Sequence, residues 1–130
     1  MTEIRHLVPD GLPTPNGYSH VVVAPADRIV FVSGQVPLDA GGNLVGEGDV
    51  PAQARQVFEN LSTALEAAGA SWSNVVKLNF FVRDVAEMPA VRTIRDQYVD
   101  AEHAPASTLV EVSRLFRDDV LVEVDAVAVL

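Results

Sequence analysis

Apolar residues recur every three or four positions after Asp49 and predict one long helix over residues 50–68. Asp49 is suited to cap the first turn, and Pro51 falls inside that turn, where its missing N–H costs little. Gly69 is suited to end the helix. The residues that share the apolar face are Ala54, Val57, Phe58, Leu61, Ala64, Leu65 and Ala68.

A second, shorter helix is predicted near residue 90, because four apolar residues again recur at helical spacing. Pro89 falls in its first turn. The predicted buried stripe consists of Met88, Val91, Ile94 and Tyr98.

Alternating and β-branched residues predict the strands. The runs at 21–23 and 28–34, separated by APAD, suggest a hairpin, and a short strand is predicted around Leu44 and Val45. The remaining strands are expected at 75–83, with Val76, Leu78, Phe80 and Val82 on one face, at 108–112 and at 121–129. This order fits one α+β domain over residues 1–130, a sandwich in which both helices cover one face of a six-stranded mixed sheet.

Two helices leave the other face of such a sheet uncovered. In the last predicted strand, small apolar residues alternate with Glu123 and Asp125. The alternation is taken to place Leu109 and Glu111 on the same uncovered face, with Thr108, Val110 and Val112 opposite. The apolar residues expected there, too many to leave in water, are Phe31, Leu109, Leu121, Val127 and Val129.

A second copy of the chain is the simplest cover for this face, because most oligomers are built from identical subunits. Glu123 and Asp125 would then lie at a subunit boundary, where burial and neighbouring charge alter carboxylate pKa values. The alternative is that both are solvated surface acids, as most Asp and Glu residues are.

Composition narrows the function classes. Nine Lys and Arg against eighteen Asp and Glu give a net charge of −9, which disfavours a nucleic-acid partner. There is no cysteine, no apolar run of membrane-spanning length and no apolar leader at the N-terminus, so we expect a cytoplasmic protein without a membrane partner. The three histidines are scattered, which argues against a metal site, and no motif indicates an organic cofactor.

Five segments of the chain resemble one known family. The segments are FVSGQVPLD, ARQVFENLSTALEAAGAS, VVKLNFFVRD, APASTLVEVSRL and LVEVDAVAV, and together they span nearly the whole sequence in order. They resemble the RidA family, also called YjgF/YER057c/UK114, of reactive intermediate deaminases. The resemblance implies a chorismate-mutase-like fold and a homotrimer that holds small ligands in clefts between subunits.

The resemblance also implies a site. Glu123 matches the glutamate that holds the attacking water in the family, and Tyr18 matches the tyrosine of the N-terminal loop. Substrate contacts are further implied for Ser33, Gly34 and Thr108.

One family feature is missing. The arginine that clamps the substrate carboxylate is replaced by Ser107, and Arg92 stands where the family has an asparagine. A hydroxyl cannot replace a guanidinium in charge or reach. Arg92 and Arg95 are the candidates to supply the missing charge.

Three functions are compatible with these observations. The first is a hydrolase that resembles 2-iminobutanoate/2-iminopropanoate deaminases, with a specificity altered by Ser107. The second is a non-catalytic module that binds a small metabolite in the same cleft. An endoribonuclease is disfavoured by the acidic balance of the chain.

Overall fold

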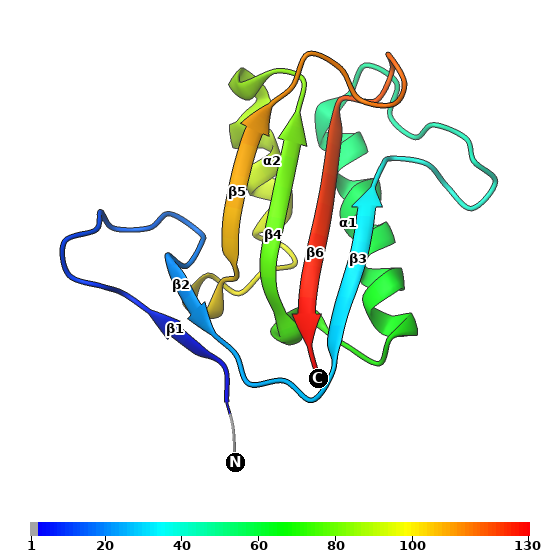
Figure 1. Ribbon diagram of the computed structural model, residues 1–130. Helices are drawn as coiled ribbons and strands as arrows, with labels where there is room; N and C mark the ends of the chain where they lie inside the picture. Colours follow the sequence, from blue (N-terminus) through cyan, green and yellow to red (C-terminus); the bar gives the residue numbers. More distant parts are fainter. Residues whose placement is uncertain (1–2) are drawn as a thin grey trace.

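The computed structural model describes residues 3–130 and places two helices on one face of a four-stranded sheet (Figure 1). The strands lie in the order β3-β6-β4-β5; β4 and β5 are parallel and the other pairs antiparallel. The bounds are β1 Arg5–Leu7, β2 Val21–Val23, β3 Ile29–Gln35, α1 Val50–Ala67, β4 Val75–Val82, α2 Met88–Arg95, β5 Ala106–Glu111 and β6 Val122–Val129, with single turns of 3₁₀ helix at Trp72–Asn74, Val85–Glu87 and Ala101–His103. The α+β fold class is confirmed.

The six strands form two sheets and not one. β2 pairs with β1, a strand the sequence did not predict, so the predicted hairpin between residues 21–23 and 28–34 is wrong. The N–H groups of Asp27 and Arg28 both donate to the carbonyl of Leu130, which fastens the start of β3 to the end of β6. Near residue 44 the structure has only an isolated bridge between Leu38 and Leu44.

Helix α1 has the predicted ends, and its predicted apolar face packs inward except at Ala68, the exposed C-cap residue. The Asp49 carboxylate accepts a hydrogen bond from the backbone N–H of Ala52, and Pro51 lies in the first turn. Gly69 adopts a φ of 78°, the left-handed conformation that ends many helices. Val57, Phe58 and Leu61 are fully buried against the sheet, so this helix supplies much of the core.

Helix α2 is shorter than its apolar pattern suggested. It ends at Arg95, and Tyr98 therefore lies beyond it, half-buried, with its ring stacked 5.2 Å from that of Phe58. Arg95 takes the fourth buried position of the helix in its place.

Strand register corrects two further predictions. A shift between Val75 and Lys77 places Val75 in the core, where Val76 was expected. In the parallel pair β4–β5, Leu109 lies beside Phe80, so it faces the helices and packs against the core. Glu111 lies on that side too, where it accepts a hydrogen bond from the N–H of Val85.

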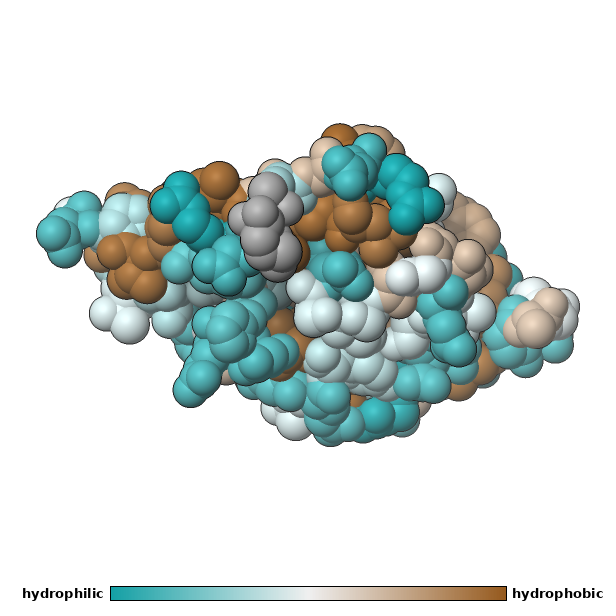
Figure 2. Space-filling model, turned by 90° about the horizontal axis from the view of Figure 1, so that it is seen from below, coloured by the Kyte–Doolittle hydropathy of each residue, from teal (hydrophilic) through white to brown (hydrophobic). Residues whose placement is uncertain are grey.

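The sheet face away from the helices is open. Figure 1 shows this face toward the viewer, with no element in front of its four strands. Phe31 of β3 lies beside Val127 on this face and is 76% exposed. When the molecule is seen from below, hydrophobic surface gathers along the upper side, which corresponds to the open face, and the helix side below is mostly hydrophilic (Figure 2).

Candidate functional site on the open face of the sheet

Glu123 projects from the middle of the open face. It lies beside Phe81 of β4, on the side of β6 opposite the buried Val122 and Val124. Among the described residues, nothing donates a hydrogen bond to its carboxylate or forms a salt bridge with it. Burial raises the pKa of Glu123 above its usual value, and the negative charge of Asp125 raises it further. Glu111, which was expected on this open face, faces the helices.

Ser33 and Gly34 form an irregular stretch of β3 beside this carboxylate. The pairing of β3 with β6 shifts register between Val32 and Gln35, which leaves both residues exposed. The Glu123 carboxylate lies directly against Gly34, in the space where a Cβ would stand. The structure therefore brings together three of the predicted residues, Ser33, Gly34 and Glu123.

Polar side chains of β4 extend the open face toward β5. Asn79 donates a 2.7 Å hydrogen bond to Asp125. The ammonium group of Lys77 donates a 2.7 Å hydrogen bond to the hydroxyl of Thr108, which lies exposed on this face. Lys77 and Asn79 are not among the predicted site residues, although both alternate with the buried Leu78 and Phe80 and so had to face the other way.

Tyr18 and Ser107 form a separate group at the edge of β5. Ser19 forms a parallel bridge with Ala106, and its N–H donates to the carbonyl of Pro105, so the N-terminal loop lies along the start of this strand. Ser107 lies beside Leu78 and faces the helix side. Tyr18 is half-buried in the adjoining loop, with its ring 5.2 Å from that of His20.

One chain does not bring the two groups together. Glu123 lies on β6 and faces away from the helices, whereas Ser107 lies on β5 and faces toward them, with β4 between the two strands. A site containing both residues therefore needs the edge of one chain to meet the open face of another.

The two candidate arginines differ in their exposure to solvent. Arg92 is exposed on α2. The side chain of Arg95 is only 6% exposed, and its guanidinium contacts Asp96, with 2.8 Å between Nη2 and Oδ1. It also lies directly against the backbone of Gly17, the residue before Tyr18.

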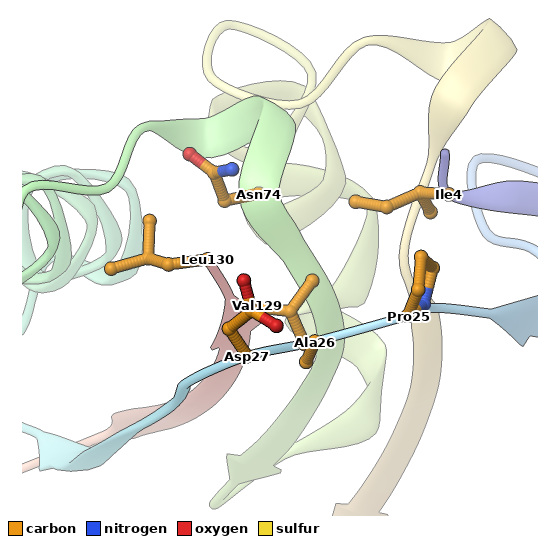
Figure 3. A pocket seen from close by; sticks show the side chains of 7 residues that line it. All are labelled: Ile4, Pro25, Ala26, Asp27, Asn74, Val129 and Leu130. Atoms are coloured by element: carbon orange, nitrogen blue, oxygen red, sulfur yellow. The ribbon is translucent and has the colours of Figure 1, made fainter. Parts of the chain in front are cut away.

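The candidate site residues do not line the cavity at the lower end of the sheet in Figure 1. That cavity has a volume of about 410 Å³ and is shown in Figure 3; its walls are Ile4, Pro25, Ala26, Asp27, Asn74, Val129 and Leu130. Within residues 3–130, no group of three or more His, Asp or Glu side chains is placed to hold a metal ion. No helix in the same range is long and apolar enough to cross a membrane.

Comparison with known proteins identifies the family. The family model described as Endoribonuclease L-PSP matches residues 10–130. The chain is 45% identical over 119 residues to a RutC family protein of Synechocystis, with 91% of this chain and 90% of that protein covered. The chain therefore belongs to the RidA, or YjgF/YER057c/UK114, family that its motifs resemble.

Two relatives carry the names of enzymes. The 3-aminoacrylate deaminase RutC of Acinetobacter baylyi is 38% identical, with 94% of each chain covered. The 2-iminobutanoate/2-iminopropanoate deaminase of Salmonella typhimurium is 40% identical, with 78% of this chain and 79% of that protein covered. A deaminase-like role is thus represented among the relatives.

Solved structures agree with the fold. YyfB of Yersinia pestis, a Rid-family protein of unknown function, superposes with a TM-score of 0.86 at 33% identity and 98% coverage of both chains. TdcF of E. coli, crystallised with bound serine, superposes with a TM-score of 0.71 at 33% identity, with 92% of this chain and 91% of TdcF covered.

Proposed function

We propose that this protein hydrolyses the C=N bond of a small imine, or of the imine that an enamine forms by tautomerisation, in a cleft completed by a second copy of the chain. The observation that carries the proposal is the Glu123 carboxylate. It is partly buried, its pKa is raised, and it has no partner among the described residues. A carboxylate of this kind is suited to hold a water molecule and accept its proton, because a raised pKa makes it a stronger base.

The proposed reaction needs only acid–base chemistry. Glu123 takes a proton from water as the water oxygen adds to the imine carbon, and it passes this proton to the nitrogen as the C=N bond becomes a single bond. The hydroxyl proton of this carbinolamine then moves to the nitrogen as the C–N bond breaks, so ammonia leaves and a carbonyl compound remains. No cofactor is needed for these steps. The exposed Ser33 and Gly34 beside Glu123 leave room for a substrate.

A second copy supplies the rest of the proposed site. Ser107 cannot meet Glu123 within one chain, since it lies on β5 and faces the helix side. Tyr18 lies in the loop along the outer edge of β5, so that β5 and β4 separate it from β6. The exposed Phe31 gives the open face an apolar surface for a neighbouring chain. A closed trimer, as the family resemblance implies, would place an edge of one subunit against the open face of the next.

A binding module without turnover is the second candidate function. It is favoured by Ser107, because the substrate clamp implied by the resemblance is absent from β5, and the serine-bound TdcF shows that a relative holds a small ligand. An endoribonuclease remains disfavoured by the net charge of −9.

An assay on 2-iminobutanoate and 2-iminopropanoate generated in situ tests the proposal. We expect wild-type turnover, a loss of at least about a hundredfold in Glu123→Gln, and no change in the matched control Glu66→Gln, an exposed acid on α1. Ser107→Arg is expected to increase turnover of these carboxylate-bearing substrates. Saturable binding of imine or product without any turnover would favour the binding module instead.

A further inference from the structure

The most unusual charged group outside the open face is the guanidinium of Arg95. An arginine side chain that is 94% removed from solvent is costly unless charge and hydrogen bonds compensate it. Among residues 3–130, its salt bridge is to the neighbouring Asp96 alone, and Asp96 is itself 57% exposed. Such an incompletely paired, buried cation indicates a place for a further anion.

The donors of Arg95 are only partly used. Nε donates a 2.9 Å hydrogen bond to Oδ1 of Asp96, and Nη2 lies 2.8 Å from the same oxygen. No described residue accepts a hydrogen bond from Nη1. Since every fully buried side-chain nitrogen and oxygen in the described residues has a partner, Nη1 retains some access to solvent. The guanidinium is thus not completely shielded from solvent at Nη1.

The position of this guanidinium relates it to the missing clamp. It lies so close to Gly17 that a Cβ at that residue would overlap Nη2 and Cζ. Tyr18 follows Gly17, and Ser19 then pairs with Ala106, the residue before Ser107.

Arg95 and Ser107 also lie on the same side of the sheet. Ser107 faces the helices, and α2, which carries Arg95, lies on that same side of the sheet (Figure 1). The guanidinium therefore lies against Gly17, next to Tyr18 in the chain, on the side of the sheet that Ser107 faces.

We propose that Arg95 anchors the anionic group of the substrate, and so supplies from α2 the charge that β5 lacks at Ser107. The substrate would then remain a carboxylate-bearing imine or enamine, since a guanidinium is well suited to bind a carboxylate through two hydrogen bonds. Asp96 would compete with the ligand for this group, which predicts weaker anchoring than by an arginine without a partner. This inference rests on the proposed function for the choice of substrate, but it can be tested by binding alone.

The test compares binding of 2-oxobutanoate, the product-like acid, with that of its uncharged methyl ester by calorimetry. Wild type is expected to prefer the acid by about tenfold or more, and Arg95→Gln to lose that preference. The matched control is Arg55→Gln, an exposed arginine on the solvent face of α1. Ser107→Arg in the Arg95→Gln background is expected to restore the preference.

Two variants keep the test decisive if Arg95→Gln does not fold. Arg95→Lys keeps the charge but loses the two-pronged geometry, so the preference for the acid should fall. Asp96→Asn, at an exposed position, removes the competing carboxylate, so the preference should rise. An unchanged preference in Arg95→Gln or Arg95→Lys would overturn the inference. The inference would also be overturned if Arg92→Gln, and not Arg95→Gln, lost the preference for the acid. An unchanged or weaker preference for the acid in Asp96→Asn would overturn it as well.

The outcomes separate this inference from the proposed function. If acid binding depends on Arg95 but imines are not turned over, the proposed hydrolase activity is refuted and the role of Arg95 in anchoring the anion stands. Imine turnover with the same KM in wild type and Arg95→Gln would refute the anchor and leave the hydrolase.

Discussion

Gly34 and Glu123 lie in direct contact, with the carboxylate of Glu123 in the space that a side chain at position 34 would occupy. Gly34 has no left-handed backbone conformation, so the glycine is not required by the backbone itself. Its lack of a side chain instead leaves room for the carboxylate.

Gly34→Ala should therefore reduce activity while leaving the fold intact. The added methyl group forces the end of the Glu123 side chain to move, and a displaced base loses its alignment with water; we expect kcat to fall about tenfold or more. Thermal unfolding should change little, because only the flexible end of a side chain has to shift. Gly41→Ala, in an exposed turn, is the matched control. Wild-type kcat in Gly34→Ala would argue against Glu123 as the base.

Asp125→Asn should shift the acid limb of the pH–rate profile to lower pH. Burial and then the charge of Asp125 raise the pKa of Glu123, so removing that charge lowers it. The base then becomes deprotonated at a lower pH. The profile of kcat/KM against pH measures this shift, and a limb that stays in place would exclude Glu123 as its origin.

The stability of the protein should also depend on the protonation of Glu123. Its pKa in the folded protein lies above the unfolded value of 4.5, so this residue contributes stability that is fully present below pH 4.5 and is lost as pH rises through the folded pKa. Glu123→Gln should abolish this contribution. Urea unfolding of both proteins between pH 4 and pH 8 measures the difference, and Glu123→Gln should gain stability relative to wild type as pH rises. A Glu123→Gln variant that instead loses stability relative to wild type would contradict the prediction.

Phe31→Asp should block self-association. Phe31 is 76% exposed on the open face, and a charge there would have to be buried by a neighbouring chain. We expect the mass measured by light scattering to fall to that of one chain. Phe116→Asp is the control, since Phe116 is also largely exposed, at 61%, but lies outside the sheet. Equal masses for wild type and Phe31→Asp would exclude this face as the interface.

Gln53→Leu should destabilise the fold strongly. The amide of Gln53 is fully buried and bonds to the carbonyls of Gly46 and Asp119 and the N–H of Leu121, which ties α1 to the chain on either side. Leucine leaves these groups buried without partners, at a cost of about 3 kcal/mol or more in the free energy of unfolding. Gln56→Leu is the matched control, because within the described part of the chain the Gln56 side chain bonds only to that of Asn60. Equal effects of the two substitutions in urea unfolding would contradict this interpretation.

The sequence predicted the elements that depend on local chemistry. The cap at Asp49, the end of α1 at Gly69 and the buried face of β6 follow from residue type and spacing alone, and all three are confirmed. Pairing depends on distant segments, and there the predictions failed. β2 joins β1 and not β3, and no short-range pattern indicates which partner a three-residue strand will take.

The candidate site residues were likewise predicted correctly where local alternation decides their position, and not where strand pairing does. Alternation along β6 correctly placed Glu123 and Asp125 on the open face. It could not show which face Leu109 and Ser107 occupy, because that follows from the register of β5 against β4. The contact between Arg95 and Gly17 joins residues far apart in the chain and had no sequence signal at all.

β6 follows every other strand in the chain, yet it lies in the middle of the sheet, between β3 and β4 (Figure 1). During synthesis, β3 and β4 leave the ribosome before the strand that pairs with both has been made. Their unpaired edges are then open to association with other nascent chains. The sheet therefore cannot close until β6 has been made, and the edges of β3 and β4 are most open to association in that interval.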